Sequence, residues 1–291
     1  AFLEAAYRAE HGLEPADLSA LAVVSGLAVR RGQVVLFGDS DERFRVRGGN
    51  DQVPRRLAAA LREPVRTGHA LEALRRDDEG RYHLTFRGGR GSVDVRARRV
   101  VLALPFSRLR EVELHGSLGL SAAKAAAIAQ LVYATTSKTL LAYERPAWRA
   151  AGQSGEAYAD LDVPCTWEAS RGLSDAGAGA GAGAVLTVYR GAGLALRFAT
   201  MGAAQDRAAS LADVERLLPG SLATARPGFV RASWAASSTA PGSYSALAVG
   251  QAALRAAAAG AEGGLHFAGE HTSEAAQGFM EGAVESGERA A

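Results

Sequence analysis

Hydrophobic residues recur along this chain with two different periods, which together predict a mixture of helices and strands. Apolar residues spaced three or four apart indicate helices at 2–10, 16–29, 121–131 and 203–218. Alternating or continuous apolar runs indicate strands at 45–47, within 65–105, and at 133–143, 157–167, 185–201, 229–235 and 265–268. The pattern therefore predicts the α/β fold class.

Two further helices carry positions that call for attention. Asn50 is a typical N-cap residue, and a helix is expected after it. The apolar face of that helix consists of Val53, Leu57 and Leu61. Near the carboxy terminus, Gly282 and Gly287 lie inside an expected helix, where each costs about 1 kcal/mol relative to alanine. A close approach of another part of the chain is therefore expected at both glycines.

Composition narrows the function without identifying it. The 291 residues are 48% hydrophobic with a formal net charge of +2, so no broad field for nucleic acid or membranes is predicted. The single cysteine, Cys165, excludes an internal disulfide and a cysteine-rich metal site; no metal site is predicted, and Cys165 is expected to be buried. No apolar run approaches the roughly 20 residues of a membrane span. The Gly/Ala-rich stretch 175–184 is expected to be a surface loop.

The carboxy-terminal stretch GGLHFAGEHTSEAAQGFMEGAVESGERAA predicts a strand, a polar turn and a helix. The strand ends at Gly269, and the helix is expected to begin at Gln277. Such a turn directs backbone N–H groups and a positive dipole end toward a ligand. Glu270 is placed to accept hydrogen bonds from sugar-like hydroxyls. Periodicity alone is equally consistent with an ordinary turn of an α/β protein.

Within this stretch, FAGEHTSEAAQGFMEGAVESGERAA resembles the carboxy-terminal signature of the FAD-dependent amine oxidases, the family of flavin monoamine, polyamine and L-amino-acid oxidases. The cofactor-binding residues that this resemblance implies here are Gly269, Glu270, Gln277, Gly278, Phe279 and Met280. Gly269 and Glu270 would meet the ribitol and phosphate part of FAD, and the backbone at 278–280 would cover the pyrimidine edge of the flavin ring. A helix N-terminus there would stabilise the negative charge of a reduced flavin.

The same resemblance extends to two places earlier in the chain. Gly48-Gly49 followed by Asn50 makes a GGN turn, which on its own is more often structural. In the amine oxidases a turn of this kind, followed by a short helix, re-enters the FAD domain. Leu71 lies in a meander of strands and corresponds to a position whose backbone touches the adenine of FAD in the family.

Lys138 interrupts the apolar strand expected at 133–143. A lysine in a strand lies most often on the solvent face and sometimes pairs with a buried carboxylate. The surrounding pattern SKTLLAYERPAW resembles the amine oxidase segment whose lysine holds a water against flavin N5. This resemblance implies that Lys138 is catalytic and places a polar group where the flavin receives hydride and meets dioxygen.

Trp234 and Tyr244 lie ten residues apart across a Ser/Gly/Pro-rich turn, an arrangement that usually reflects ordinary packing. The resemblance implies that Tyr244 and Phe279 form the two sides of an aromatic slot that desolvates a neutral amine, with Trp234 preceding the loop. Two positions depart from the family. Ser243 stands where the monoamine oxidases carry a flavin-linked cysteine, so FAD should be non-covalent. Phe279 stands where tyrosine or tryptophan is more usual.

The phosphate-binding GxGxxG turn of a βαβ unit is absent from the sequence. In the family that unit is amino-terminal, so this sequence resembles the later part of the family. We expect an α+β substrate-binding domain (1–43 and 106–239) interleaved with a partial, Rossmann-like FAD-binding domain (44–105 and 240–291).

The resemblance implies oxidation of a primary or secondary amine, or an L-amino acid, to an imine, with dioxygen reduced to hydrogen peroxide. The expected partners are therefore a small-molecule amine or amino acid and dioxygen, without nucleic acid, and a homodimer is left open. Two alternatives also stay open. One is a related carotenoid- or porphyrinogen-type FAD oxidoreductase. The other is a truncated, non-catalytic fragment or one half of a two-chain flavoprotein, which the missing phosphate-binding turn favours.

Overall fold

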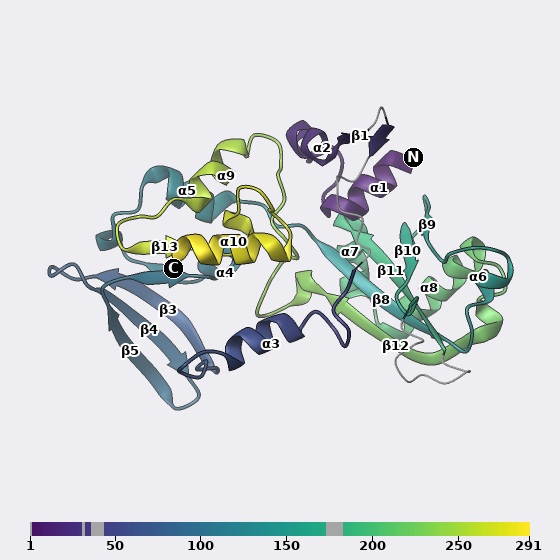
Figure 1. Ribbon diagram of the computed structural model, residues 1–291, viewed down its shortest axis with the longest axis horizontal. Coiled ribbons are helices and arrows are strands. Elements are labelled where there is room, and N and C mark those ends of the chain that lie inside the picture. Colours follow the sequence, from purple (N-terminus) through teal and green to yellow (C-terminus); the bar gives the residue numbers. More distant parts are fainter. Residues whose placement is uncertain (1, 31–32, 36–43, 173–182) are drawn as a thin grey trace.

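The computed structural model describes residues 2–30, 33–35, 44–172 and 183–291, and it places them in two lobes that each contain a sheet (Figure 1). One lobe holds a four-stranded sheet of order β5-β4-β3-β7 and a parallel pair, β13-β6. The other holds an antiparallel five-stranded sheet of order β12-β8-β11-β10-β9. The α/β fold class predicted from the sequence is confirmed.

The first lobe is built from the middle and the end of the chain. Its strands are β3 (His69–Arg76), β4 (Tyr82–Gly88), β5 (Gly91–Ala97), β6 (Val100–Leu102), β7 (Glu113–Leu114) and β13 (Leu265–Phe267). Its helices are α4 (Phe106–Leu109), η1 (Gly116–Leu118), α5 (Ala122–Gln130), α9 (Ala252–Ala259), η4 (Glu270–Thr272) and α10 (Met280–Ala290). The expected strand meander after residue 65 is therefore present. Its core includes Leu74, Phe106 and Phe267, and residues of α5 also pack there.

The second lobe packs helices against the five-stranded sheet. Its strands are β8 (Thr136–Tyr143), β9 (Ala157–Tyr158), β10 (Cys165–Glu168), β11 (Ala184–Gly191) and β12 (Ala225–Ser233). Its helices are α6 (Ala147–Ala150), α7 (Ala192–Thr200), α8 (Ala203–Leu217), η2 (Leu222–Thr224) and η3 (Trp234–Ala236). Burial alternates along β8, so Leu141 and Tyr143 enter a core with Trp148 and Val214, while Lys138 lies on the other face. Cys165 is buried, as expected.

The remaining elements lie beside the second lobe or between the lobes (Figure 1). They are α1 (Phe2–His11), α2 (Ala20–Gly26), β1 (Ala28–Arg30), β2 (Gln33–Val35) and α3 (Gln52–Ala59). The predicted division into two interleaved domains stays a prediction.

Several expected boundaries are wrong. The strand expected at 185–201 ends at Gly191, where the backbone of Arg8 packs so closely that a side chain would collide with it, and α7 follows. Apolar runs of this length are compatible with either structure. The strand expected at 157–167 is two strands, and the helix expected at 16–29 is limited to α2.

The segment around Asn50 also differs from the expectation. Residues 45–47 are not a strand, and Asn50 does not cap α3: its side chain accepts a hydrogen bond from the Val46 N–H (3.2 Å), and Asp51 is the N-cap residue. Leu57 and Leu61 on the apolar face are 61% and 58% exposed. The expected loop at 175–184 falls, through residue 182, outside the described residues; Ala184 begins β11.

One of the two helix glycines in α10 is explained by packing. A Cβ at Gly282 would collide with the carbonyl oxygen of Ala276 and lie 2.8 Å from the Cβ of Ser273. A Cβ at Gly287 would meet no atom within 4 Å. The close approach expected from the sequence is therefore present at Gly282 and wrong for Gly287.

This difference predicts opposite effects of one substitution in one helix. Gly282→Ala should destabilise the protein, because Ser273 and the Ala276 carbonyl would have to move. Gly287→Ala should raise the free energy of unfolding by roughly 0.5–1 kcal/mol through helix propensity alone. Urea unfolding of both variants against the parent chain measures the two effects. Equal changes in the two variants would contradict the packing account.

Candidate functional site

The turn between β13 and α10 is closed by one carboxylate. Gly269 has φ +124°, a conformation that favours glycine, and a Cβ there would lie 2.6 Å from the ring of His271. Directly after it, Glu270 accepts hydrogen bonds from the N–H of Ser245 (2.8 Å), the hydroxyl of Ser245 (2.8 Å) and the N–H of Gly278 (2.7 Å). The amide of Gln277 donates to the same Ser245 hydroxyl (2.8 Å).

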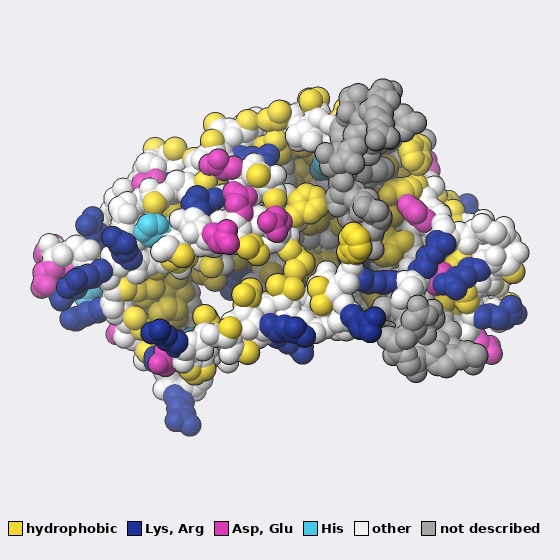
Figure 2. Space-filling model, in the orientation of Figure 1, with side chains coloured by type: hydrophobic (Ala, Val, Ile, Leu, Met, Phe, Trp, Pro, Cys, Tyr) yellow, Lys and Arg dark blue, Asp and Glu magenta, His cyan; other side chains and the backbone are white. Residues whose placement is uncertain are grey.

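Because of these hydrogen bonds, the last helix begins later than the sequence predicts. The sequence predicts that it begins at Gln277, but Gly278 has φ +85° and gives its N–H to Glu270, so α10 begins at Met280 with Phe279 as its N-cap residue. Phe279 and Met280 are 53% and 52% exposed. Figure 2 shows exposed hydrophobic side chains around the hollow between the two lobes, over α3 and near the start of α10.

A cavity of about 170 Å³ lies against this turn. Its described lining residues are Ala103, Pro105, Ser107, Tyr133, Ala240, Gly242, Ser243, Gly269, Glu270 and His271. Gly48, Gly49 and Leu71 are not among them: the two glycines form an exposed turn before α3, and Leu71 packs against the first core. Their predicted contacts with a cofactor therefore stay predictions.

His271 is the buried polar residue of the cavity wall that sequence reasoning missed. Its side chain is 2% exposed and lies edge-on to Phe106 (4.5 Å between ring centroids), and its Nε2 has no hydrogen-bond partner among the described residues. Burial, together with the nearby Lys124 ammonium, lowers the pKa of His271 to about 4. The imidazole is therefore neutral at physiological pH.

Lys138 lies among aromatic rings on the sheet of the second lobe. Its ammonium is 5.4 Å from the ring centroids of Trp167 and Tyr189 and 5.8 Å from that of Trp234. Tyr189 is directly opposite Lys138 in the pairing of β11 with β8. We call Lys138, Trp167, Tyr189 and Trp234 the lysine cage. Contacts of a cation with ring faces stabilise it by about 0.5–2 kcal/mol each, depending on desolvation.

Sequence reasoning identified Lys138 and Trp234 but missed Trp167 and Tyr189. Both lie on strands, but Tyr189 reaches Lys138 through the pairing of β11 with β8, and Trp167 through the pairing of β10 with β11, which no local pattern reports. Tyr244 adjoins the cage through its hydroxyl, 3.3 Å from that of Tyr189. It also donates a hydrogen bond to the Glu10 carbonyl of α1. Burial raises the pKa of Tyr244.

One loop connects the lysine cage with the cavity. It begins at Trp234, lines the cavity with Gly242 and Ser243, and continues through Tyr244 to Ser245, which binds Glu270. A Cβ at Gly278 would lie 4.0 Å from the ring of Tyr244, so the start of the last helix also borders this loop. The predicted residues Lys138, Trp234, Tyr244, Glu270 and Gly278 are thus contiguous, whereas the roles predicted for them stay untested.

Two features are absent from the described part of the chain. There, no group of three or more His, Cys, Asp or Glu residues is arranged to hold a metal ion. No helix in the same residues is long and apolar enough to cross a membrane.

Comparison with known proteins gives a consistent result. The family model described as flavin-containing amine oxidoreductase matches residues 9–291. The flavin-dependent L-tryptophan oxidase RebO of Lentzea aerocolonigenes is 32% identical over 124 residues, 42% of this chain and 25% of that protein. The putative L-amino-acid oxidase YobN of Bacillus subtilis is 24% identical over 278 residues, 94% of this chain and 57% of that protein.

Solved structures share the fold. The cyclohexylamine oxidase from Brevibacterium oxydans superposes with a TM-score of 0.75 at 21% identity, covering 99% of this chain and 62% of that chain. Putrescine oxidase bound to putrescine gives a TM-score of 0.69 at 22% identity, covering 83% and 51%. The chain therefore spans between a quarter and about three fifths of the length of these relatives.

The neutral state of His271 predicts how stability depends on pH. The pKa of His271 in the folded protein, about 4, lies below its ordinary value of 6.5. As pH falls from 6.5 to 4, His271 therefore binds a proton in the unfolded chain but stays neutral in most of the folded protein. Between pH 6.5 and 4 this difference lowers the free energy of unfolding by about 3 kcal/mol, at 1.36 kcal/mol per pKa unit. Over the same range His271→Gln should lose about 3 kcal/mol less than the parent chain, as measured by urea unfolding.

The exposed His69 supplies the comparison variant, His69→Gln, which makes the same exchange at a position outside the cavity wall. If His271→Gln loses as much stability as the parent chain between pH 6.5 and 4, the imidazole of His271 is not held neutral in the folded protein.

Proposed function

This chain belongs to the flavin-containing amine oxidoreductase family, and we propose that the protein containing it oxidises a primary or secondary amine or an L-amino acid. In the overall reaction an amine and dioxygen give an imine and hydrogen peroxide. Water then hydrolyses the imine to a carbonyl compound and ammonia, or to a carbonyl compound and a primary amine when the substrate is a secondary amine. The observation that carries the proposal is the lysine cage, which lies one loop away from the cavity at the turn of Glu270.

The cofactor that the family implies is FAD, and the cavity offers groups that fit part of it. Gly269 gives close backbone access at φ +124°, and His271 presents a buried nitrogen without a partner among the described residues. The carboxylate of Glu270 uses three of about four acceptor positions. A cavity of about 170 Å³ suits the phosphate or ribityl portion and not the whole dinucleotide. When bound, FAD supplies a two-electron acceptor that dioxygen can reoxidise.

Ser243 supports non-covalent binding. It lines the cavity, and its hydroxyl donates to the carbonyl of Ala134 (3.0 Å). A serine hydroxyl cannot form the thioether that a cysteine forms, so in this proposal FAD is held by hydrogen bonds and packing alone.

The chain's own residues would act on the substrate by excluding water and orienting it. The rings of Trp167, Tyr189 and Trp234 give an apolar surface on which an amine loses hydration, and desolvation favours its neutral form, the form that can be oxidised. In this proposal Tyr244 and Phe279 flank the substrate. The Lys138 ammonium keeps a proton donor at the reacting end.

The relatives leave two substrate classes, which the proposal includes. RebO and YobN are described as oxidases of L-tryptophan and L-amino acids, while the structural neighbours are oxidases of cyclohexylamine and putrescine. The aromatic walls around a cation suit an apolar or aromatic substrate that is neutral or carries a carboxylate better than a second ammonium group. We therefore place an aromatic L-amino acid first among substrates to test.

The test is a visible absorption spectrum of the protein purified with added FAD, recorded anaerobically with L-tryptophan, cyclohexylamine and putrescine in turn. Retained flavin bands that bleach with one of these compounds, followed by release of ammonia in air, are expected. The intact mass of the same sample shows whether the polypeptide is this chain, at 30.1 kDa, or a longer one that contains it. Bleaching without ammonia would indicate a flavin oxidoreductase of another kind, and absence of retained flavin would overturn the proposal for this chain.

Lys138→Met tests the role proposed for the lysine. Removing the ammonium while keeping an unbranched side chain should slow anaerobic bleaching or reoxidation by about 100-fold, because a positioned polar group is lost at the reacting atoms. FAD content, measured from the absorbance ratio, should stay the same. Lys138→Arg, which keeps a positive charge, is the comparison variant. Equal rates in the parent chain and Lys138→Met would remove Lys138 from the proposed mechanism.

A further inference from the structure

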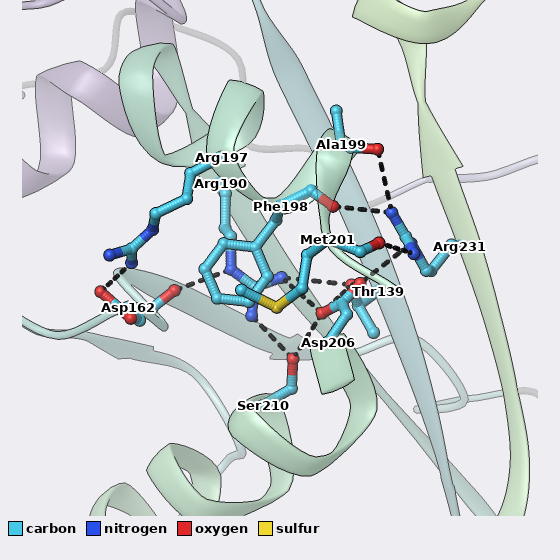
Figure 3. Close-up of polar contacts among 10 residues, drawn as sticks. All are labelled: Thr139, Asp162, Arg190, Arg197, Phe198, Ala199, Met201, Asp206, Ser210 and Arg231. Atoms are coloured by element: carbon cyan, nitrogen blue, oxygen red, sulfur yellow. Dashed lines mark hydrogen bonds and ion pairs between the residues drawn. The ribbon is translucent and has the colours of Figure 1, made fainter. Parts of the chain in front are cut away.

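A buried ion network joins the sheet of the second lobe to α8 (Figure 3). The side chains of Arg190 on β11 and Asp206 on α8 are 0% and 1% exposed. Asp206 is shared between two guanidinium groups: Arg231 Nε lies 3.0 Å from its Oδ2, and Arg190 Nη1 lies 3.4 Å from its Oδ1. We call Thr139, Arg190, Asp206, Ser210 and Arg231 the Asp206 network.

Two hydroxyl groups complete the network. Thr139 on β8 donates to Asp206 Oδ2 (3.1 Å) and accepts from Arg190 Nη1 (3.1 Å). Ser210, one turn along α8, donates to Asp206 Oδ1 (3.0 Å) and accepts from Arg190 Nη2 (2.7 Å). Figure 3 shows these side chains converging from the sheet and from α8. Asp206 therefore contacts three adjacent strands, directly or through one hydrogen bond.

The two arginines make further contacts with the surrounding backbone and with one aromatic ring. Arg190 Nε donates to the carbonyl of Asp162 (2.7 Å), and its guanidinium stacks on the ring of Phe198 (3.6 Å to the centroid). Arg231 donates to the carbonyls of Met201 (2.8 Å) and Phe198 (2.6 Å). Burial lowers the pKa of Arg190 to about 10, which still leaves it charged at neutral pH.

The network and the lysine cage are connected by neighbouring residues on the same strands. Thr139 follows Lys138 on β8, and Arg190 follows Tyr189 on β11. On β12, Arg231 is opposite Thr139, and the strand leads three residues later to Trp234. Because successive side chains point to opposite faces of a sheet, each strand contributes to the network beneath the sheet and to the cage above it.

This arrangement can specify the register of the strands. A slip of one residue would carry Lys138 or Tyr189 to the opposite face. Such a slip would also separate Arg190 or Arg231 from the buried carboxylate, leaving a buried charge unpaired, which is strongly unfavourable. Apolar packing by itself penalises a slip less specifically, and well-packed apolar residues can stabilise a core as well as a buried ion pair does.

We propose that Asp206 is a positioning residue that, through Arg190, Thr139 and Arg231, holds β8, β11 and β12 in the register that assembles the lysine cage. The link to catalysis rests on the proposed function. The link to the geometry of the cage does not, so the two can be tested separately.

The lysine content of the chain makes the geometry directly measurable. Lys124 and Lys138 are its two lysines, and both ammonium groups lie near aromatic rings. Protein labelled with ¹³C at the lysine ε-carbon gives two ε-methylene NMR signals, which ring currents displace from their position in the unfolded chain. Lys124, whose Nζ is 3.9 Å from the Phe267 centroid in the other lobe, is an internal control.

The first variant is Asp206→Asn, which keeps the shape of the side chain and removes its charge. Its matched control on the same helix is Asp213→Asn, which removes a carboxylate paired with the exposed Arg216 (2.9 Å). In Asp206→Asn the Lys138 signal should lose its displacement while the Lys124 signal keeps its own. In Asp213→Asn both signals should stay where they are in the parent chain. A folded Asp206→Asn protein with an undisturbed Lys138 signal would overturn the proposal.

If Asp206→Asn does not fold, the Lys124 and Lys138 signals both move to their positions in the unfolded chain, and a second variant is needed. Arg190→Met, Asp206→Leu and Arg231→Met together replace the charges by apolar side chains, a kind of exchange that is often neutral or stabilising. If the network only contributes stability, this folded variant should show the parent Lys138 signal, which overturns the proposal. If the network positions the cage, the Lys138 signal should change while the Lys124 signal stays.

Kinetics add the link to catalysis. With a substrate that the parent protein oxidises, kcat should fall in Asp206→Asn and stay at the parent value in Asp213→Asn, at equal FAD content. If the parent protein has no oxidase activity, the proposed function is wrong, but the NMR comparison still tests whether Asp206 positions the lysine cage. A Lys138 signal that loses its displacement in Asp206→Asn without any change in kcat would separate the cage from catalysis and overturn that part of the proposal.

Discussion

Alternation along β8 is the constraint on which the rest of the second lobe depends. One face of this strand sends Leu141 and Tyr143 into the core and Thr139 to the buried carboxylate of Asp206, and the other face carries Lys138. Burying a large apolar side chain contributes roughly 1.5–3 kcal/mol, whereas an exposed ion pair contributes about 1 kcal/mol or less. A register that keeps Leu141 and Tyr143 in the core therefore also keeps Lys138 on the opposite face.

The connection between the lobes depends on a short stretch of loop. Backbone bonds join Ser243 and Tyr244 to Ala134 just before β8, at 2.8 and 2.7 Å. The next residue, Ser245, gives both its N–H and its hydroxyl to Glu270 at the start of η4. The loop is thus attached on one side to the strand that bears Lys138 and on the other to the carboxy-terminal turn, so the lysine cage and the cavity are positioned by the same few residues.

The sequence allowed the fold class, the strand meander, most of the helices and the turn at Gly269 to be predicted, because each depends on local periodicity or on one glycine. It did not predict contacts that depend on pairing between distant strands. Tyr189 meets Lys138 only through the register of β11 with β8, and Trp167 comes from the next strand. The early start assigned to the last helix has a similar origin, since the residue that takes the N–H of Gly278 lies eight positions away.

Glu270 shows why family membership and geometry must be considered together. Glu270 accepts three hydrogen bonds that close the turn and fix Gly278. These bonds alone would explain a carboxylate at this position, even in a protein without a ligand. Two features exceed that structural need. Glu270 lines a cavity whose wall also contains the buried His271 nitrogen, and Gly269 brings the backbone to the same wall in a conformation open mainly to glycine. A turn that served only to start a helix would not require an imidazole whose buried Nε2 has no hydrogen-bond partner among the described residues, since an unsatisfied buried polar atom costs roughly 1–3 kcal/mol. That cost is consistent with the proposal that this wall meets a polar part of the cofactor of the flavin-containing family to which the chain belongs.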